Sequence, residues 1–81
     1  MKKYQKVEKI TTPEGFKYFI MKVQAAIKTG QENLETFMCV FQYKDDPISY
    51  ICPLLEWMDL STNKNYSSLI LYQLIDEKSI S

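Results

Sequence analysis

Hydrophobic and polar residues alternate along this chain in blocks, with apolar segments separated by four polar breaks. The breaks cover residues 11–15, 28–33, 44–47 and 61–65. They are rich in Gly, Pro, Asn, Asp and Thr, residue types that favour turns and loops. No segment repeats another, and no break is long enough to be an interdomain linker. We therefore expect a single domain over residues 1–81.

The segment 16–29 fits two periodicities. As a helix it would have Thr12 as its cap, Pro13 in its first position and an apolar stripe; the stripe is Phe16, Phe19, Ile20, Val23 and Ile27. As a strand it would alternate apolar and polar side chains from residue 21 to residue 28. We favour the strand, because the polar turn 28–33 and the β-favouring segment 34–43 would complete a long hairpin.

Four further elements follow from the pattern. The lysine-rich segment 3–10 predicts an edge strand, since charged side chains protect an exposed sheet edge. Residues 48–52 predict a strand that ends at Pro53, which cannot donate a ladder hydrogen bond, and residues 53–60 predict a short helix. The spacing of apolar residues in 67–78 predicts a C-terminal helix, although 68–75 would also suit a buried strand.

Together these elements predict an α+β fold. We expect a small antiparallel sheet, curved or barrel-like, with one or two short helices. The alternative is a small all-α bundle, which would follow if the segments with two periodicities were all helical.

Composition adds an expectation of self-association. Hydrophobic residues make up 46% of the 81 residues and aromatic residues 14%. A chain this short buries a modest fraction of its surface, so some apolar area must be shared with a copy or a partner. Cys39 and Cys52 lie among apolar neighbours and predict buried thiols rather than a disulfide framework. No apolar run is long enough to cross a bilayer. The basic start of the chain is not followed by the apolar run of a signal peptide, so we expect no membrane partner and a cytoplasmic location.

The residue types argue against catalysis. All ten basic residues are Lys, and the chain has neither Arg nor His. Without His the chain lacks both an unaided base near neutral pH and the commonest metal ligand, two separated Cys do not form a zinc site, and two distant glycines cannot form a phosphate loop. We therefore predict no enzyme activity, no cofactor and no metal. Zero net charge and the absence of Arg argue against a nucleic-acid partner.

Charge is unevenly distributed along the chain. Residues 1–30 hold seven Lys and two acids, whereas residues 31–81 hold three Lys and eight acids. Folding could either separate these sets onto two faces or interleave them, and we favour interleaving. Acidic and aromatic residues nevertheless gather in one stretch, and they form our candidate partner-binding set: Tyr43, Asp45, Asp46, Tyr50, Glu56 and Asp59. Trp57, in the same stretch, is expected in the core.

These observations lead to two functional hypotheses. The first is a small non-catalytic intracellular protein-binding module, such as a phage or mobile-element inhibitor. Its acidic and aromatic groups would occlude a basic surface of a host defence or nucleic-acid-handling protein. The alternative is an oligomer that sequesters an anionic nucleotide or another small molecule at subunit interfaces, held by Lys and Tyr.

Overall fold

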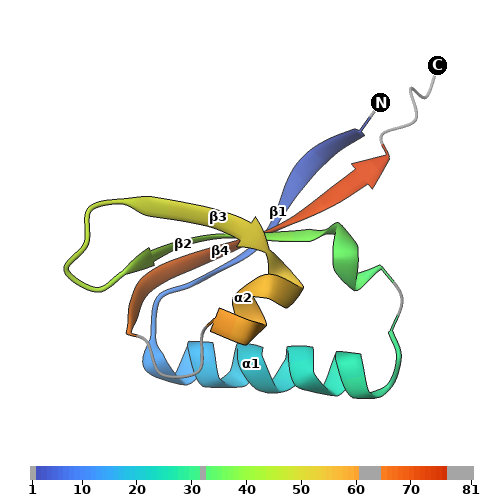
Figure 1. Cartoon of the computed structure of the whole chain (residues 1–81), viewed down its shortest axis with the longest axis horizontal. Coiled ribbons are helices and arrows are strands. Elements are labelled where there is room, and N and C mark those ends of the chain that lie inside the picture. The colour runs from blue at the N-terminus through green and yellow to red at the C-terminus, as the bar shows by residue number, and fades with distance from the viewer. Residues whose placement is uncertain (1, 32, 61–64, 77–81) are drawn as a thin grey trace.

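The computed structural model describes residues 2–31, 33–60 and 65–76. Its elements are β1 (Lys2–Ile10), α1 (Pro13–Lys28), a 3-10 turn η1 (Leu34–Thr36), β2 (Phe37–Tyr43), β3 (Ser49–Pro53), α2 (Leu54–Leu60) and β4 (Tyr66–Asp76). The strands form one antiparallel sheet in the order β1-β4-β2-β3, with α1 and α2 on the same side (Figure 1). The predicted α+β class is therefore confirmed and the all-α alternative is wrong. The sheet is open, with β1 and β3 as its edges, rather than closed into a barrel.

The connections explain why α1 and α2 lie on the same face of the sheet. Each βαβ unit joins two parallel strands that are separated by a third strand, because β4 lies between β1 and β2, and β2 lies between β4 and β3. This is a split βαβ arrangement. The strands of the two units point in opposite directions, and the crossover from β1 to β2 moves across the sheet in the opposite direction to the crossover from β3 to β4. Two crossovers of the same hand therefore put α1 and α2 on the same face of the sheet.

The strand predicted over residues 16–29 is wrong, because this segment belongs to helix α1. The Oγ1 of Thr12 accepts the backbone N–H of Gly15 at 3.0 Å, and Pro13 occupies the first turn. Gly30, with a φ of 72°, ends the helix, so the polar turn that follows is not a hairpin turn. Capping therefore outweighs the alternation that Met21 and Ile27 suggested; these side chains are 64% and 46% exposed.

The helix predicted over residues 67–78 is also wrong where the structure describes it, since residues 66–76 form strand β4. This strand pairs with β1 on one side and with β2 on the other. Leu69 and Leu71 are buried towards the helices, whereas Ile70 and Tyr72 take the opposite face. A nearly continuous apolar run suits a central strand as well as a helix, and pairing on both edges decides between them. Residues 77 and 78 lie outside the described residues.

The other predicted elements form, with two changes of boundary: residues 34–36 make the turn η1 instead of the start of a strand, and Pro53 is the last residue of β3 instead of the first residue of the helix. β1 is an edge strand, and β2 and β3 form a hairpin around residues 44–48. Asp45 in this turn has a left-handed φ of 66°, which Asp tolerates better than most residues. Strand β3 ends at Pro53 and α2 begins at Leu54.

The core lies between the sheet and the two helices. Trp57 of α2 is fully buried, as predicted, and its ring lies 5.6 Å from those of both Phe19 and Tyr66. The buried core residues are Ile10, Phe19, Val23, Cys39, Phe41, Leu54, Trp57, Leu69 and Leu71. All of this packing serves one face of the sheet, and no helix or strand formed by the described residues covers the other face (Figure 1).

Candidate binding surface

The uncovered face of the sheet is strongly apolar. In β2, Cys39 and Phe41 are buried towards the helices, so Met38 and Val40 must point the other way. Cross-strand pairing extends this surface over all four strands, because directly opposed residues share a face. We call this surface the open face; its apolar residues are Tyr4, Met38, Val40, Ile51, Pro53, Ile70, Tyr72 and Leu74.

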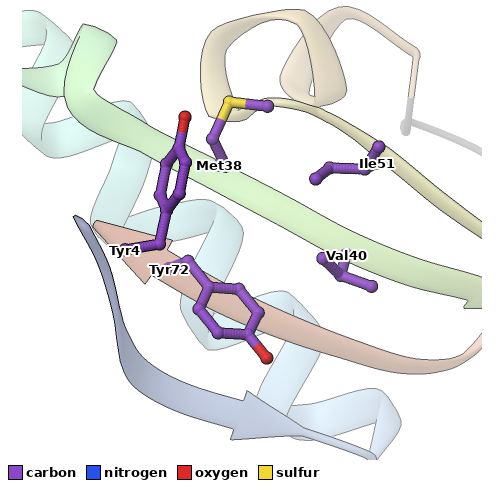
Figure 2. Close-up of a pocket in the computed structure, with 5 residues that line it drawn as sticks. All are labelled: Tyr4, Met38, Val40, Ile51 and Tyr72. Carbon is purple, nitrogen blue, oxygen red and sulfur yellow. The ribbon is translucent and has the colours of Figure 1, made fainter. Parts of the chain in front are cut away.

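A shallow depression marks the centre of the open face. It has a volume of about 240 Å³, and its lining side chains lie on the side of the sheet away from α1 (Figure 2). One or two residues come from each strand: Tyr4, Met38, Val40, Ile51 and Tyr72. Tyr4 is 52% exposed and Ile51 is 65% exposed. The depression is therefore part of a contiguous exposed apolar patch, a feature typical of interaction surfaces.

Charge on the open face is mainly basic and lies on β1, and Asp76, opposite Lys2, adds an acidic group at the end of β4. Lys2, Lys6 and Lys9 are exposed and lie opposite Asp76, Tyr72 and Ile70, respectively. An irregularity between Lys6 and Glu8 shifts the alternation, which keeps Lys9 on the open face. It turns Glu8 towards α1, where its carboxylate accepts a hydrogen bond from Lys22 at 3.2 Å.

The opposite edge of the open face is uncharged. Strand β3 contributes Ser49, Ile51 and Pro53 to this face. The open face thus has a basic edge at β1, an apolar centre and a neutral edge at β3.

Four residues of the predicted partner-binding set gather at the β2–β3 turn. The Tyr50 hydroxyl donates to Asp46 at 3.2 Å, and the ring centroids of Tyr43 and Tyr50 lie 5.4 Å apart. Asp46 also accepts the backbone N–H of Ile48 at 2.9 Å, so its carboxylate is used within the turn. The hydrogen bond to this carboxylate raises the pKa of Tyr50, and Asp45 lies exposed beside it.

The other two predicted residues lie on a different element. Glu56 and Asp59 are exposed on α2, three residues apart, on the covered side of the sheet. The structure therefore brings four of the six residues together at the turn and places the remaining two acids apart from them on a helix, and the role of the set in partner binding stays a prediction.

The two thiols of the chain are neutral near pH 7. Cys39 is fully buried, and burial together with the nearby Cys52 raises its pKa to about 12. Burial also raises the pKa of Cys52, with a further contribution from Glu56. Both are free cysteines, directly opposed across β2 and β3. Since the thiolate is the reactive form, neither has the character of a nucleophile.

The covered side holds a second cavity and two unsatisfied polar atoms. The cavity, of about 230 Å³, lies between β1, α1 and η1, with Glu8 and Lys22 among its lining residues. The indole N–H of Trp57 and the hydroxyl of Tyr66 are buried without a hydrogen bond of good geometry. Burial, and secondarily Tyr43, raises the pKa of Tyr66 to about 12, and the neighbouring Trp57 N–H opposes part of this rise. Within residues 2–31, 33–60 and 65–76, no group of three His, Cys, Asp or Glu could hold a metal.

The fold and this surface define a class of protein, a two-layer α+β domain with an uncovered apolar sheet face. Comparison of the chain with protein-family models, with curated proteins and with solved structures gives no match. None of the helices formed by the described residues is long and apolar enough to span a membrane.

Sequence reasoning missed the open face, although a signal for it was present. In β2 and β4 both alternating sets of positions are apolar, as Met38 and Ile70 show beside Cys39 and Leu69. Strands of this kind are usually covered on both faces. The pattern therefore indicated a second covering layer that the chain does not provide within its described residues.

Proposed function

We propose that this chain is a non-catalytic protein-binding module that binds through its open face. The observation that carries the proposal is the mismatch between the strands and their covering. The central strands β4 and β2 are apolar on both faces, whereas α1 and α2 cover one. Contiguous apolar surface bordered by polar residues is typical of protein interfaces, and a partner would supply the missing layer.

The charges around the open face define the partner that would fit. The contact surface of such a partner is apolar at its centre, and it presents neutral or acidic groups to Lys2, Lys6 and Lys9 of β1. A basic group near the β2–β3 turn would be attracted by Asp45 and Asp46. Inhibition of a host protein with a basic surface, a phage origin and a cytoplasmic location remain predictions from the sequence.

One observation favours a second candidate, sequestration of an anionic small molecule. Lys6 lies directly opposite Tyr72 on the neighbouring strand, beside the central depression. At about 240 Å³ this depression is smaller than the roughly 300–1,000 Å³ of typical ligand sites. Since its lining is almost wholly apolar, a protein surface fits it better than a nucleotide, and we rank sequestration second.

Site-specific photocrosslinking tests the proposal in cells of the natural host. A photoreactive amino acid replaces Ile51 on the open face or, as the matched control, Ile27 on α1. Both side chains are exposed, at 65% and 46%. We expect one defined adduct, identified by mass spectrometry, from position 51 and none from position 27. No adduct at position 51, or the same adduct from both positions, would contradict the proposal.

A further inference from the structure

We infer that the occupant of the open face is a second copy of this chain, packed sheet against sheet around a two-fold axis parallel to the strands. The inference rests on the proposed function, since it names the partner of the same surface. It specifies a symmetric dimer in which each copy supplies the other's missing layer.

The size of the open face suits such a dimer. The four strands contain 9, 7, 5 and 11 residues. At about 3.3 Å per residue and 4.8 Å between strands, they cover roughly 500 Å² in projection. Side chains such as Tyr4 and Ile51 give this face relief, so its accessible area is larger than its projection. It therefore approaches the roughly 800 Å² that each partner contributes to a stable interface.

The distribution of charge favours this chain as its own partner. The open face needs a surface that is apolar at its centre and carries no cation opposite Lys2, Lys6 and Lys9. The β3 edge of a second copy has this character, since its open-face residues are uncharged. Zero net charge means that two copies do not repel each other as whole molecules.

The same lysines select the orientation of the two copies. An axis parallel to the strands places β1 over β3 of the other copy and β4 over β2. The methylene chains of Lys6 and Lys9 can then cover Ile51, while their ammonium groups lie along the edge from which the Asp45–Asp46 turn extends. An in-plane axis perpendicular to the strands would place β1 over β1 in antiparallel orientation, which brings the lysines of one copy close to those of the other. Like charges in contact disfavour that arrangement.

A nucleic acid is the competing occupant, because lysines and two tyrosines share this face. The centre between them, however, is aliphatic, with Val40, Ile51 and Ile70 in place of further stacking rings. Single strands bind through a basic groove with stacked aromatic side chains. The apolar centre therefore favours a protein layer.

Native mass spectrometry and sedimentation equilibrium of the full chain, from about 1 to 100 μM, test the inference. We expect a dimer. Ile51→Asp should raise its dissociation constant at least tenfold, and the matched control Ile27→Asp should leave the dissociation constant unchanged. Circular dichroism checks that each variant is folded, and Ile51→Thr, which keeps a β-favouring residue, is expected to weaken the dimer in the same direction. A monomer throughout this range, or equal effects at positions 51 and 27, overturns the inference.

Isotope-filtered NOE spectra of mixed labelled and unlabelled protein test the orientation. We expect contacts between the methyl groups of Ile51 and the methylene groups of Lys6 or Lys9 of the other copy. Contacts of β1 with β1 overturn the parallel axis. A second result would overturn the choice of occupant: a mixed-sequence single-stranded oligonucleotide that converts the dimer into a salt-sensitive complex with the monomer.

The two proposals fail in distinguishable ways. A monomer that still gives an adduct with a different protein from position 51 refutes the second copy and keeps the protein-binding function. A monomer without any adduct at position 51 refutes both.

Discussion

Truncation of Trp57 tests how far this small core depends on one side chain. The indole is fully buried between α1 and the sheet, against Phe19 and Tyr66. Replacing a buried Trp with Ala typically costs about 3–5 kcal/mol. A domain of this size has a net stability of only about 3–5 kcal/mol. We therefore expect Trp57→Ala to be largely unfolded at 25 °C without denaturant.

Trp57→Phe separates packing from hydrogen bonding at the same position. It removes roughly 40 Å³ of side chain, so the cavity term, at about 24 cal/mol per Å³, is about 1 kcal/mol, and the lost transfer free energy of the removed atoms adds about 1 kcal/mol more. It also removes the buried indole N–H, which lacks a hydrogen bond of good geometry. Removing an unsatisfied donor recovers about 1–3 kcal/mol. The two effects oppose each other, so we expect Trp57→Phe to lie within about 1 kcal/mol of the natural chain.

Urea titration followed by far-UV circular dichroism measures both variants. All samples are compared at one protein concentration, because association would make the midpoint depend on concentration. Met21→Ala, on the exposed side of α1, is the control and should change stability by less than about 0.5 kcal/mol. If Trp57→Phe were as damaging as Trp57→Ala, the indole N–H would be making a strong hydrogen bond and our account of the core would be refuted.

Three further changes probe the helix cap, the buried thiol and the surface ion pair. Thr12→Ala removes the side-chain cap of α1 and should lower the free energy of unfolding, measured by urea titration, by about 1 kcal/mol, whereas Thr12→Ser should keep most of the stability that the cap provides. Equal losses of stability in the two variants would show that the cap bond contributes nothing. Because the pKa of Cys39 rises from its ordinary 9.0 to about 12 on folding, its contribution to stability is intact below pH 9. It is lost as the pH rises from 9 towards 12, so the urea midpoint should fall over this window, and more steeply than in Cys39→Ala; parallel pH profiles would contradict the assignment. In thiol-reagent kinetics at pH 8, half-buried Cys52 should react before Cys39, which should react only on unfolding; simultaneous reaction would show that the β2–β3 hairpin opens. Glu8→Gln removes an exposed ion pair with Lys22 and should change the free energy of unfolding by less than about 1 kcal/mol, and less still in high salt; a larger loss would mean that the pair supports the neighbouring cavity.

Local chemistry was sufficient for the elements whose signals agree with one another. The lysine-rich β1 edge, the β2–β3 hairpin, the stop at Pro53 and the short helix after it were all predicted from the sequence. The turn cluster of Tyr43, Asp45, Asp46 and Tyr50 was also predictable, because these residues are close in sequence. Burial of Trp57 followed from its size and apolar neighbours.

Two segments were predicted wrongly because their local signals conflict. Residues 16–29 satisfy both a helical stripe and an alternation, and the Thr12 cap decided the outcome. Residues 66–76 could be helix or strand, and the strand forms because β4 is paired along both edges. Its partners are distant in sequence, as Lys2 opposite Asp76 shows. No local pattern contains that pairing.

The open face separates what the sequence determined from what the tertiary structure decided. The sequence alone determined that β2 would carry apolar residues on both faces and that β1 would carry lysines. Only the tertiary structure decided that Lys2, Lys6 and Lys9 share a face with Tyr72 and Ile51, and that α1 and α2 both lie on the opposite face. The physical reason is that alternation fixes the two faces of each strand locally, whereas strand order and the hand of the crossovers decide which face the helices cover.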